Sequence, residues 1–249
     1  MNTNIQNINI QNINIQNINL NNLKLNSNGC QFIKNAYDKD SINNLKNKIS
    51  DFIVKNKILH HVHQNKDLLG KDFYLNCGNK KVNSYHEMKY GKRCTINVRG
   101  DEHGRTDTNL LDFFNPQYLF GLEISHIVNI DNICKLLNKL SGKQWYLDRT
   151  NIYVNIEIKN TRGFHTDTKY PYIKVFLPLT DIKDINDGPY CYMQYSQQSN
   201  PKIKPSPVIF CPANQGDMII SYQNGLHRGC PQKEGRIRKM LVFGFKQKV

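Results

Sequence analysis

The sequence lacks a long hydrophobic run, a signal peptide and any Cys-x-x-Cys pair. No apolar stretch in its 249 residues approaches the roughly 18 residues that suggest a membrane-spanning helix. The N-terminus has neither the cationic start nor the apolar centre of a secretory signal. Its seven cysteines are odd in number and scattered, which argues for reduced thiols and against a zinc ribbon. We therefore expect a soluble, cytoplasmic protein with no membrane partner.

Arginine is also scarce, although the chain is strongly basic. The formal net charge is +14, and only 8 of the 34 basic residues are arginine. With abundant Asn and Ile, this bias is typical of an AT-rich genome. A charge excess favours contact with polyanions, but no recognition motif accompanies it here. We predict no specific nucleic-acid partner and keep a basic nucleic-acid-binding module as the weaker alternative.

Three of the eight arginines, Arg93, Arg99 and Arg105, fall between Lys89 and Arg105 and alternate with glycines. AT-rich codons do not explain arginine. This stretch indicates either a mobile lid that supplies cations to an anionic substrate or an ordinary solvated loop.

The first 28 residues differ in composition from the rest. Residues 4–22 repeat a pentad of Asn, Ile and Gln, a period that fits neither a helix nor a strand. Tracts of this composition are usually disordered. We predict that residues 1–28 form a disordered tail with no catalytic role, and that residues 29–249 form a single domain.

Helices are predicted in the first part of this domain and strands in the second. Apolar residues recur at helical spacing in 41–57 and 131–140, with Asp40 or Ser41 as the cap of the first helix and Gly142 just beyond the second. Residues 60–108 predict short strands and loops, and 116–130 are ambiguous. From Gln144 onward, short strands and turns alternate. The predicted strands are 152–158, 172–179, 208–211, 218–222 and 239–245. The expected fold class is mainly β with α (α+β): a double-stranded β-helix (jelly roll, cupin-like) over about 144–249, buttressed by helices.

The strongest chemical signal comes from His165, Asp167 and His227. A spacing of two places His165 and Asp167 on one side of an extended backbone. His227 follows an Asn-Gly turn 62 positions later, and a jelly roll can bring such distant strand ends to one mouth. Each histidine alone is more often an ordinary core or surface residue. Together, two imidazoles and one carboxylate form the facial triad of non-haem Fe(II) oxygenases. We predict that these three residues bind a metal and form the catalytic centre.

The order of motifs over residues 152–245 resembles the phytanoyl-CoA dioxygenase family of Fe(II)- and 2-oxoglutarate-dependent oxygenases. The matching segments are Phe164-His165-Thr166-Asp167, Asp187-Gly188-Pro189, Gly216-Asp217-Met218-Ile219-Ile220, His227-Arg228-Gly229-Cys230-Pro231 and Arg236-Ile237-Arg238. Where the family often has Pro-Gly-Ser-His, this chain has Met193-Gln194-Tyr195-Ser196-Gln197. That departure concerns a loop and leaves the triad intact.

The resemblance implies an oxidoreductase, a 2-oxoglutarate-dependent dioxygenase and most simply a hydroxylase, with Fe(II) as cofactor and 2-oxoglutarate and O2 as cosubstrates. The substrate, which the sequence does not name, is a small molecule or a side chain. A halogenase would need a small residue in place of Asp167. The alternative is a cupin-like protein that binds a metal or ligand without catalysis.

The resemblance also implies an arginine that pairs with the distal carboxylate of 2-oxoglutarate, for which a planar guanidinium is suited. Arg236 and Arg238 are both candidates with the same strand parity, and the family's spacing favours Arg238. Tyr153 and Asn155 alternate with the apolar residues of their strand. They either bind the cosubstrate or face solvent.

Overall fold

The computed structural model describes residues 25–56, 58, 73–77, 85–90, 93–99, 107, 109–198 and 207–248, with the backbone alone for 73–77, 85–90 and Arg99. The N-terminal repeat lies outside these residues. So do Arg105 and most of the loops between the first strands of the large sheet. Among the described residues, no helix has the length and apolar character that a transmembrane segment requires.

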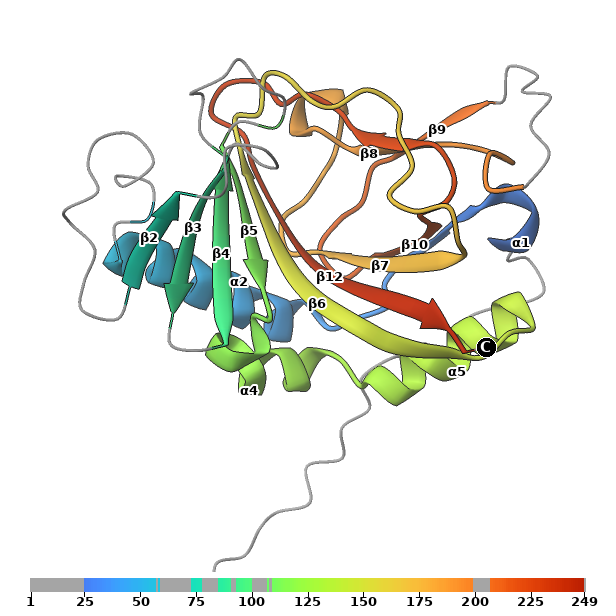
Figure 1. Ribbon diagram of the computed structural model, residues 1–249, viewed down its shortest axis with the longest axis horizontal. Helices are drawn as coiled ribbons and strands as arrows, with labels where there is room; N and C mark the ends of the chain where they lie inside the picture. The colour runs from blue at the N-terminus through green and yellow to red at the C-terminus, as the bar shows by residue number, and fades with distance from the viewer. Residues whose placement is uncertain are drawn as a thin grey trace, which may run out of the picture.

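A strongly curved antiparallel sheet of nine strands forms the body of the described structure (Figure 1). In spatial order its strands are β1 (Cys30–Ile33), β10 (Met218–Tyr222), β7 (Tyr172–Pro178), β12 (Ile237–Gln247), β6 (Trp145–Ile156), β5 (Leu110–Phe114), β4 (Cys94–Arg99), β3 (Tyr85–Tyr90) and β2 (Phe73–Cys77). A second sheet of three strands lies across its concave side. Its order is β11 (His227–Gly229), β8 (Tyr190–Met193) and β9 (Val208–Cys211). The predicted jelly roll is confirmed.

Helices cover the convex side of the large sheet, as expected for the predicted buttress (Figure 1). They are α2 (Lys39–Lys55), α4 (Gln117–Ile127) and α5 (Ile130–Ser141). Asp38 caps α2 by accepting a hydrogen bond from Ser41 N at 2.8 Å, so the predicted caps Asp40 and Ser41 are wrong by two or three positions. Asn129 caps α5, and Gly142 ends it in the left-handed conformation at φ 69°. The ambiguous segment 116–130 contains α4, which begins directly after Pro116.

A short helix, α1 (Leu25–Asn28), stands within the segment that we assigned to the disordered tail. Leu25 is buried, and the Asn26 side chain donates to Ser141 O at 3.2 Å. Residues 25–28 therefore belong to the folded domain, because they close the core beside α5. A 3-10 turn, η4 (Ile185–Asp187), precedes β8 and ends at Gly188.

Alternate residues of the central strands face two different cores. On β12, Leu241, Phe243 and Phe245 pack in the core beneath the helices, whereas Met240 and Val242 pack in a smaller core between the two sheets. On β6 the apolar residues Ile152 and Val154 likewise pack on the helix side. The intervening residues of the same strands point into the roll, because successive side chains of a strand point to opposite faces.

Candidate metal centre

Two segments that are far apart in the sequence are bonded to each other at the mouth of the roll. His165 lies in the loop between β6 and β7, and His227 is the first residue of β11. His165 N donates to His227 O at 3.1 Å, and His227 N donates to His165 O at 3.0 Å. Asp167 N then donates to Gln223 O at 2.9 Å. These backbone bonds bring the three predicted side chains to one place.

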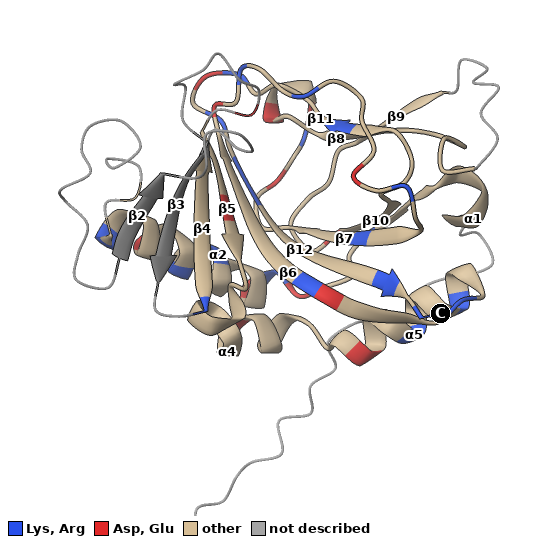
Figure 2. Ribbon diagram, in the orientation of Figure 1, with Lys and Arg blue, Asp and Glu red and all other residues tan. Residues whose placement is uncertain are grey.

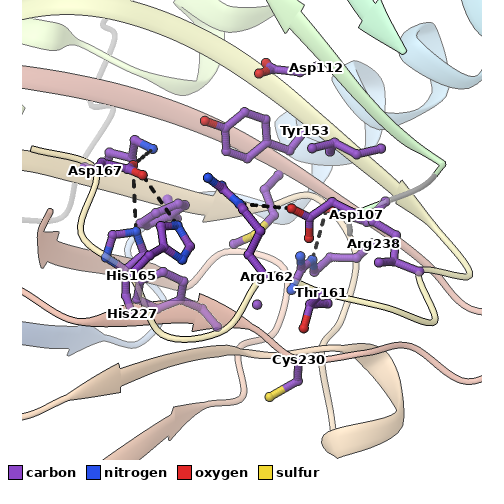
Figure 3. A pocket seen from close by; sticks show the side chains of 18 of the residues that line it. Asp107, Asp112, Tyr153, Thr161, Arg162, His165, Asp167, His227, Cys230 and Arg238 are labelled. Carbon is purple, nitrogen blue, oxygen red and sulfur yellow. Dashed lines mark hydrogen bonds and ion pairs between the residues drawn. The ribbon is translucent and has the colours of Figure 1, made fainter. Parts of the chain in front are cut away.

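The three side chains converge within the span of one metal site (Figure 3). His165 Nε2 lies 3.5 Å from Asp167 Oδ1, and His227 Nε2 lies 3.7 Å from Asp167 Oδ2. One ligand atom from each residue lies within 4.8 Å of the others. Ligands about 2.1 Å from a shared ion and at right angles to each other stand about 3 Å apart. The observed separations of 3.5 and 3.7 Å from Asp167 are close to that spacing.

Backbone carbonyls orient both imidazoles. His165 Nδ1 lies 2.8 Å from Gly163 O, and His227 Nδ1 lies 2.9 Å from Gly225 O. A carbonyl only accepts hydrogen bonds, so the proton of each neutral ring sits on Nδ1 and the lone pair of Nε2 faces Asp167. His165 Nε2 is buried and has no hydrogen-bond partner among the described residues. A buried lone pair of this kind fits a divalent metal ion.

Asp167 also pairs with a half-buried cation, Lys174 of β7. Lys174 Nζ lies 2.6 Å from Asp167 Oδ2 and 5.8 Å from the centre of the Tyr153 ring. Burial by itself would raise the pKa of Asp167, but the ammonium of Lys174 beside it outweighs burial and holds the pKa well below its usual range. Burial opposes the charge of Lys174 as well, yet Tyr153 and Asp167 raise its pKa on balance. The site therefore presents an ionised carboxylate at neutral pH.

The same pocket contains the predicted cation Arg238 (Figure 3). Arg238 stands directly opposite Asn155 across β12 and β6, and its Nε donates to Asn155 Oδ1 at 3.3 Å. Its Nη1 donates to Gly188 O. Burial lowers the pKa of Arg238 to about 10, which still leaves it charged at neutral pH. Tyr153 lines this pocket too, so Tyr153 and Asn155 face the interior of the roll rather than solvent.

Arg236 does not share the environment of Arg238. It precedes β12, its side chain is 52% exposed, and its Nη1 lies 3.5 Å from Asp187 Oδ1. We predicted that Arg236 and Arg238 point to the same face because they are two residues apart on one strand. That prediction is wrong, because Arg236 lies before the strand, where side chains do not alternate between faces. Of these two arginines, only Arg238 reaches the pocket.

The lid interpretation does not hold for Arg93. Residues 94–99 form β4 of the large sheet, and the C-terminal end of β4 is the end nearer the site. Arg93 stands at the opposite end, where its guanidinium lies 5.0 Å from the centre of the Tyr118 ring. Arg105 and the side chain of Arg99 lie outside the described residues.

Sequence reasoning missed several other pocket residues. Arg162 Nε pairs with Asp107 Oδ2 at 3.1 Å, although the two residues come from separate parts of the chain. Gln223 is fully buried, donates to Tyr190 Oη at 3.2 Å, and has an Oε1 without a hydrogen-bond partner among the described residues. The place of Gln223 just before the Asn-Gly turn was its only signal. Nothing in the sequence linked Asp107 to Arg162.

No protein-family model and no curated protein sequence matches the chain. Solved structures do resemble its fold. AviO1 from Streptomyces viridochromogenes Tue57 is 15% identical with a TM-score of 0.56, over 89% of this chain and 91% of that one. EvdO2 from Micromonospora carbonacea var. aurantiaca, solved with 2-oxoglutarate, is 10% identical with a TM-score of 0.59, over 90% of this chain and 89% of that one. The epimerase SnoN, solved with Fe3+, alpha ketoglutarate and nogalamycin RO, is 12% identical with a TM-score of 0.54, over 91% of this chain and 82% of that one. At these identities the likeness establishes the fold.

Proposed function

We propose that this chain is an Fe(II)- and 2-oxoglutarate-dependent dioxygenase that hydroxylates a small molecule or a side chain. The observation that carries the proposal is the convergence of His165, Asp167 and His227 in a pocket that also holds Arg238. Two solved structures of the same fold contain these groups: EvdO2 was solved with 2-oxoglutarate, and SnoN with Fe3+ and alpha ketoglutarate. That likeness supports the proposed cofactors.

Each pocket residue has a definite task in this proposal. His165, Asp167 and His227 would hold the ferrous ion, because two imidazoles and one carboxylate are the ligand set of non-haem Fe(II) oxygenases. Bound Fe(II), with 2-oxoglutarate and O2, supplies the oxidative chemistry. Arg238 pairs with the distal carboxylate of 2-oxoglutarate, and Asn155 and Gly188 O fix the guanidinium for that contact.

Two finer features also belong to the proposal. Membership of the phytanoyl-CoA dioxygenase family rests on the order of the sequence motifs. Hydroxylation is proposed as the simplest outcome, although a neighbour of this fold is an epimerase. An anionic substrate would meet Arg162, whose side chain lines the pocket and is 49% exposed.

The proposal is tested by loading the protein with Fe(II) and 2-oxoglutarate under anaerobic conditions, admitting O2, and measuring succinate. Uncoupled turnover of 2-oxoglutarate yields succinate without the prime substrate. We expect succinate from the unmodified chain and at least a 100-fold loss in His165→Ala, Asp167→Ala and His227→Ala. His126→Ala is the matched control, because His126 is an exposed residue of α4, on the convex side of the large sheet and outside the pocket lining.

Two other results would redirect the assignment. Metal binding that requires the triad, without any succinate, would indicate the non-catalytic cupin-like protein. Steeply salt-dependent binding to a polyanion that survives His165→Ala would indicate the nucleic-acid-binding module. The distribution of charge argues against the nucleic-acid-binding module, because Lys and Arg are spread over α2, α5, β12 and several loops (Figure 2).

A further inference from the structure

Two buried cysteines meet beside the pocket, and neither has a task in the proposed function. Cys191 lies in β8, and Cys230 directly follows β11. Their Sγ atoms are 2.8 Å apart, and the two residues are 0% and 2% exposed. We propose that Cys191 and Cys230 form a site of reversible disulfide modification. The disulfide lowers the affinity for 2-oxoglutarate at Arg238.

The backbone holds the two cysteines in register. Arg228 pairs with Cys191 and Gly229 with Tyr190, and Cys230 N continues the ladder by donating to Pro189 O at 2.9 Å. Cys191 and Cys230 are therefore diagonal neighbours on one face of two adjacent strands. A disulfide bond is about 2.05 Å long, so the sulfurs have to approach by about 0.8 Å.

A second pair of buried thiols provides an internal comparison. Cys30 and Cys211 also face each other between the sheets, but their Sγ atoms are 3.9 Å apart. That pair lies away from the pocket lining, whereas Cys230 is part of it. The Cys191 and Cys230 sulfurs are also the closer of the two pairs, so a disulfide between them needs the smaller movement.

The oxidant that we name is a low-molecular-weight disulfide such as oxidised glutathione. The Cys230 thiolate attacks it, a mixed disulfide forms, and one glutathione thiol leaves. The Cys191 thiolate then displaces the second glutathione. The two protein thiols lose two protons and two electrons, and oxidised glutathione becomes two glutathione thiols. Burial raises the pKa of Cys191, while the nearby Arg228 charge acts in the opposite direction, so the exchange is slow at neutral pH.

Disulfide formation changes the pocket through the segment that holds Arg238. Gly188 O accepts from Arg238, and a Cβ at Gly188 would lie 2.8 Å from Cys230 O, so these backbones are already in close contact. Drawing Cys230 toward Cys191 shifts that packing and with it the guanidinium. This consequence rests on the proposed function, whereas formation of the disulfide does not.

The full chain is first reduced, incubated with oxidised glutathione, denatured and alkylated with N-ethylmaleimide. Intact mass and non-reducing peptide mapping then identify the thiols that were consumed. We expect two fewer alkylated thiols than in the reduced protein, and a linked peptide that contains Cys191 and Cys230. Cys191→Ser and Cys230→Ser should not form this link, and Cys30→Ser should form it normally. The wild-type protein alone decides the question if a variant does not fold.

The proposal is overturned if Cys191 and Cys230 stay fully alkylatable, or if a Cys30–Cys211 link forms in their place. A second measurement compares 2-oxoglutarate affinity in the oxidised and reduced protein loaded with Mn(II). We expect at least a tenfold loss on oxidation and recovery with dithiothreitol. Equal affinities would refute the coupling to Arg238. Absence of 2-oxoglutarate binding in the reduced protein would instead count against the proposed function.

Discussion

Asp167 carries the negative charge around which the other polar groups of the site are arranged. It lies between two imidazoles and the ammonium of Lys174, and its side chain is 25% exposed. A carboxylate in this position is ionised before any metal arrives. Lys174 and a divalent ion both stabilise that charge, and they also repel each other because both are positive.

Replacing Lys174 with Met should separate these two effects. We expect Lys174→Met to destabilise the metal-free protein by roughly 1–3 kcal/mol, because it leaves Asp167 without its ammonium partner. Mn(II) or Co(II) should then raise the melting temperature of the variant more than that of the wild type, since the ion no longer meets a neighbouring cation. Thermal unfolding with and without metal measures both quantities.

Lys246→Met is the matched control. Lys246 Nζ also lies 2.6 Å from a carboxylate, Asp148 Oδ1, but the Lys246 side chain is half-exposed and the pair lies outside the pocket. Its loss should cost at most about 1 kcal/mol and leave the metal-induced shift unchanged. A smaller metal-induced shift in Lys174→Met than in the wild type would mean that Lys174 is needed to orient Asp167.

Arg238 and Arg236 form a second matched pair. Arg238→Met should weaken 2-oxoglutarate binding roughly 100-fold, which corresponds to losing two charge-assisted hydrogen bonds of about 1.5 kcal/mol each. Arg236→Met should leave binding unchanged. Calorimetric titration with 2-oxoglutarate provides the measurement, and equal losses in both variants would contradict the assignment of Arg238.

At the scale of the element, two glycine turns allow a direct comparison. Gly188 and Gly235 both adopt left-handed backbone, at φ 71° and 77°. A Cβ at Gly188 would lie 2.6 Å from Gln232 Cγ, whereas nothing lies within 4 Å of a Cβ at Gly235. The two glycines therefore share the conformational requirement and differ in their surroundings.

Gly235→Ala should cost about 1 kcal/mol of unfolding free energy, from backbone strain alone. Gly188→Ala should cost about 2 kcal/mol or more, and it should also weaken 2-oxoglutarate binding at least tenfold, because Gly188 O holds Arg238. Denaturant unfolding and ligand titration measure the two effects. Wild-type affinity in Gly188→Ala would show that this carbonyl does not fix the guanidinium.

Sequence patterns identified two helices, α2 and α5, and the strands β6, β7, β9, β10 and β12, because the relevant forces are local. The helical stripe of residues 131–140 and Gly142 beyond it predicted α5 to within one residue at each end. The cap of α2 was misplaced, because Asp38, Asp40 and Ser41 are all good capping residues and only the path of the backbone selects among them. Pro116 permitted a helix start that the weak periodicity of α4 did not reveal.

At the scale of the whole molecule, the short helix α1 is joined to the core of the domain. Leu25 is 1% exposed, and Asn26 Oδ1 accepts from Tyr222 Oη at 3.0 Å. The predicted tail therefore divides into residues 25–28, which pack against the core, and the repeat before them. For residues 1–22 the prediction of a non-catalytic tail stands as a proposal.

Two truncations test this division. Removal of residues 1–22 should change the unfolding free energy by less than about 0.5 kcal/mol and leave succinate formation intact. Removal of residues 1–28 should cost at least about 3 kcal/mol, because it empties the site of Leu25 and leaves Tyr222 and Ser141 without Asn26. Chemical denaturation compares the two. Equal stability of both truncated chains would show that α1 contributes nothing to the core.

The sequence by itself determined two helices, five strands, the fold class and three metal-ligand candidates, because strand alternation, helix periodicity and donor chemistry are properties of short segments. Tertiary structure decided the rest. It decided that the apolar face of β6 packs under helices, so that Tyr153 and Asn155 face the pocket, and it separated Arg238 from Arg236. It also brought Lys174 to Asp167 and Cys191 to Cys230. These outcomes depend on which distant strands become neighbours, and the burial of the whole sheet fixes that pairing, which no local pattern records.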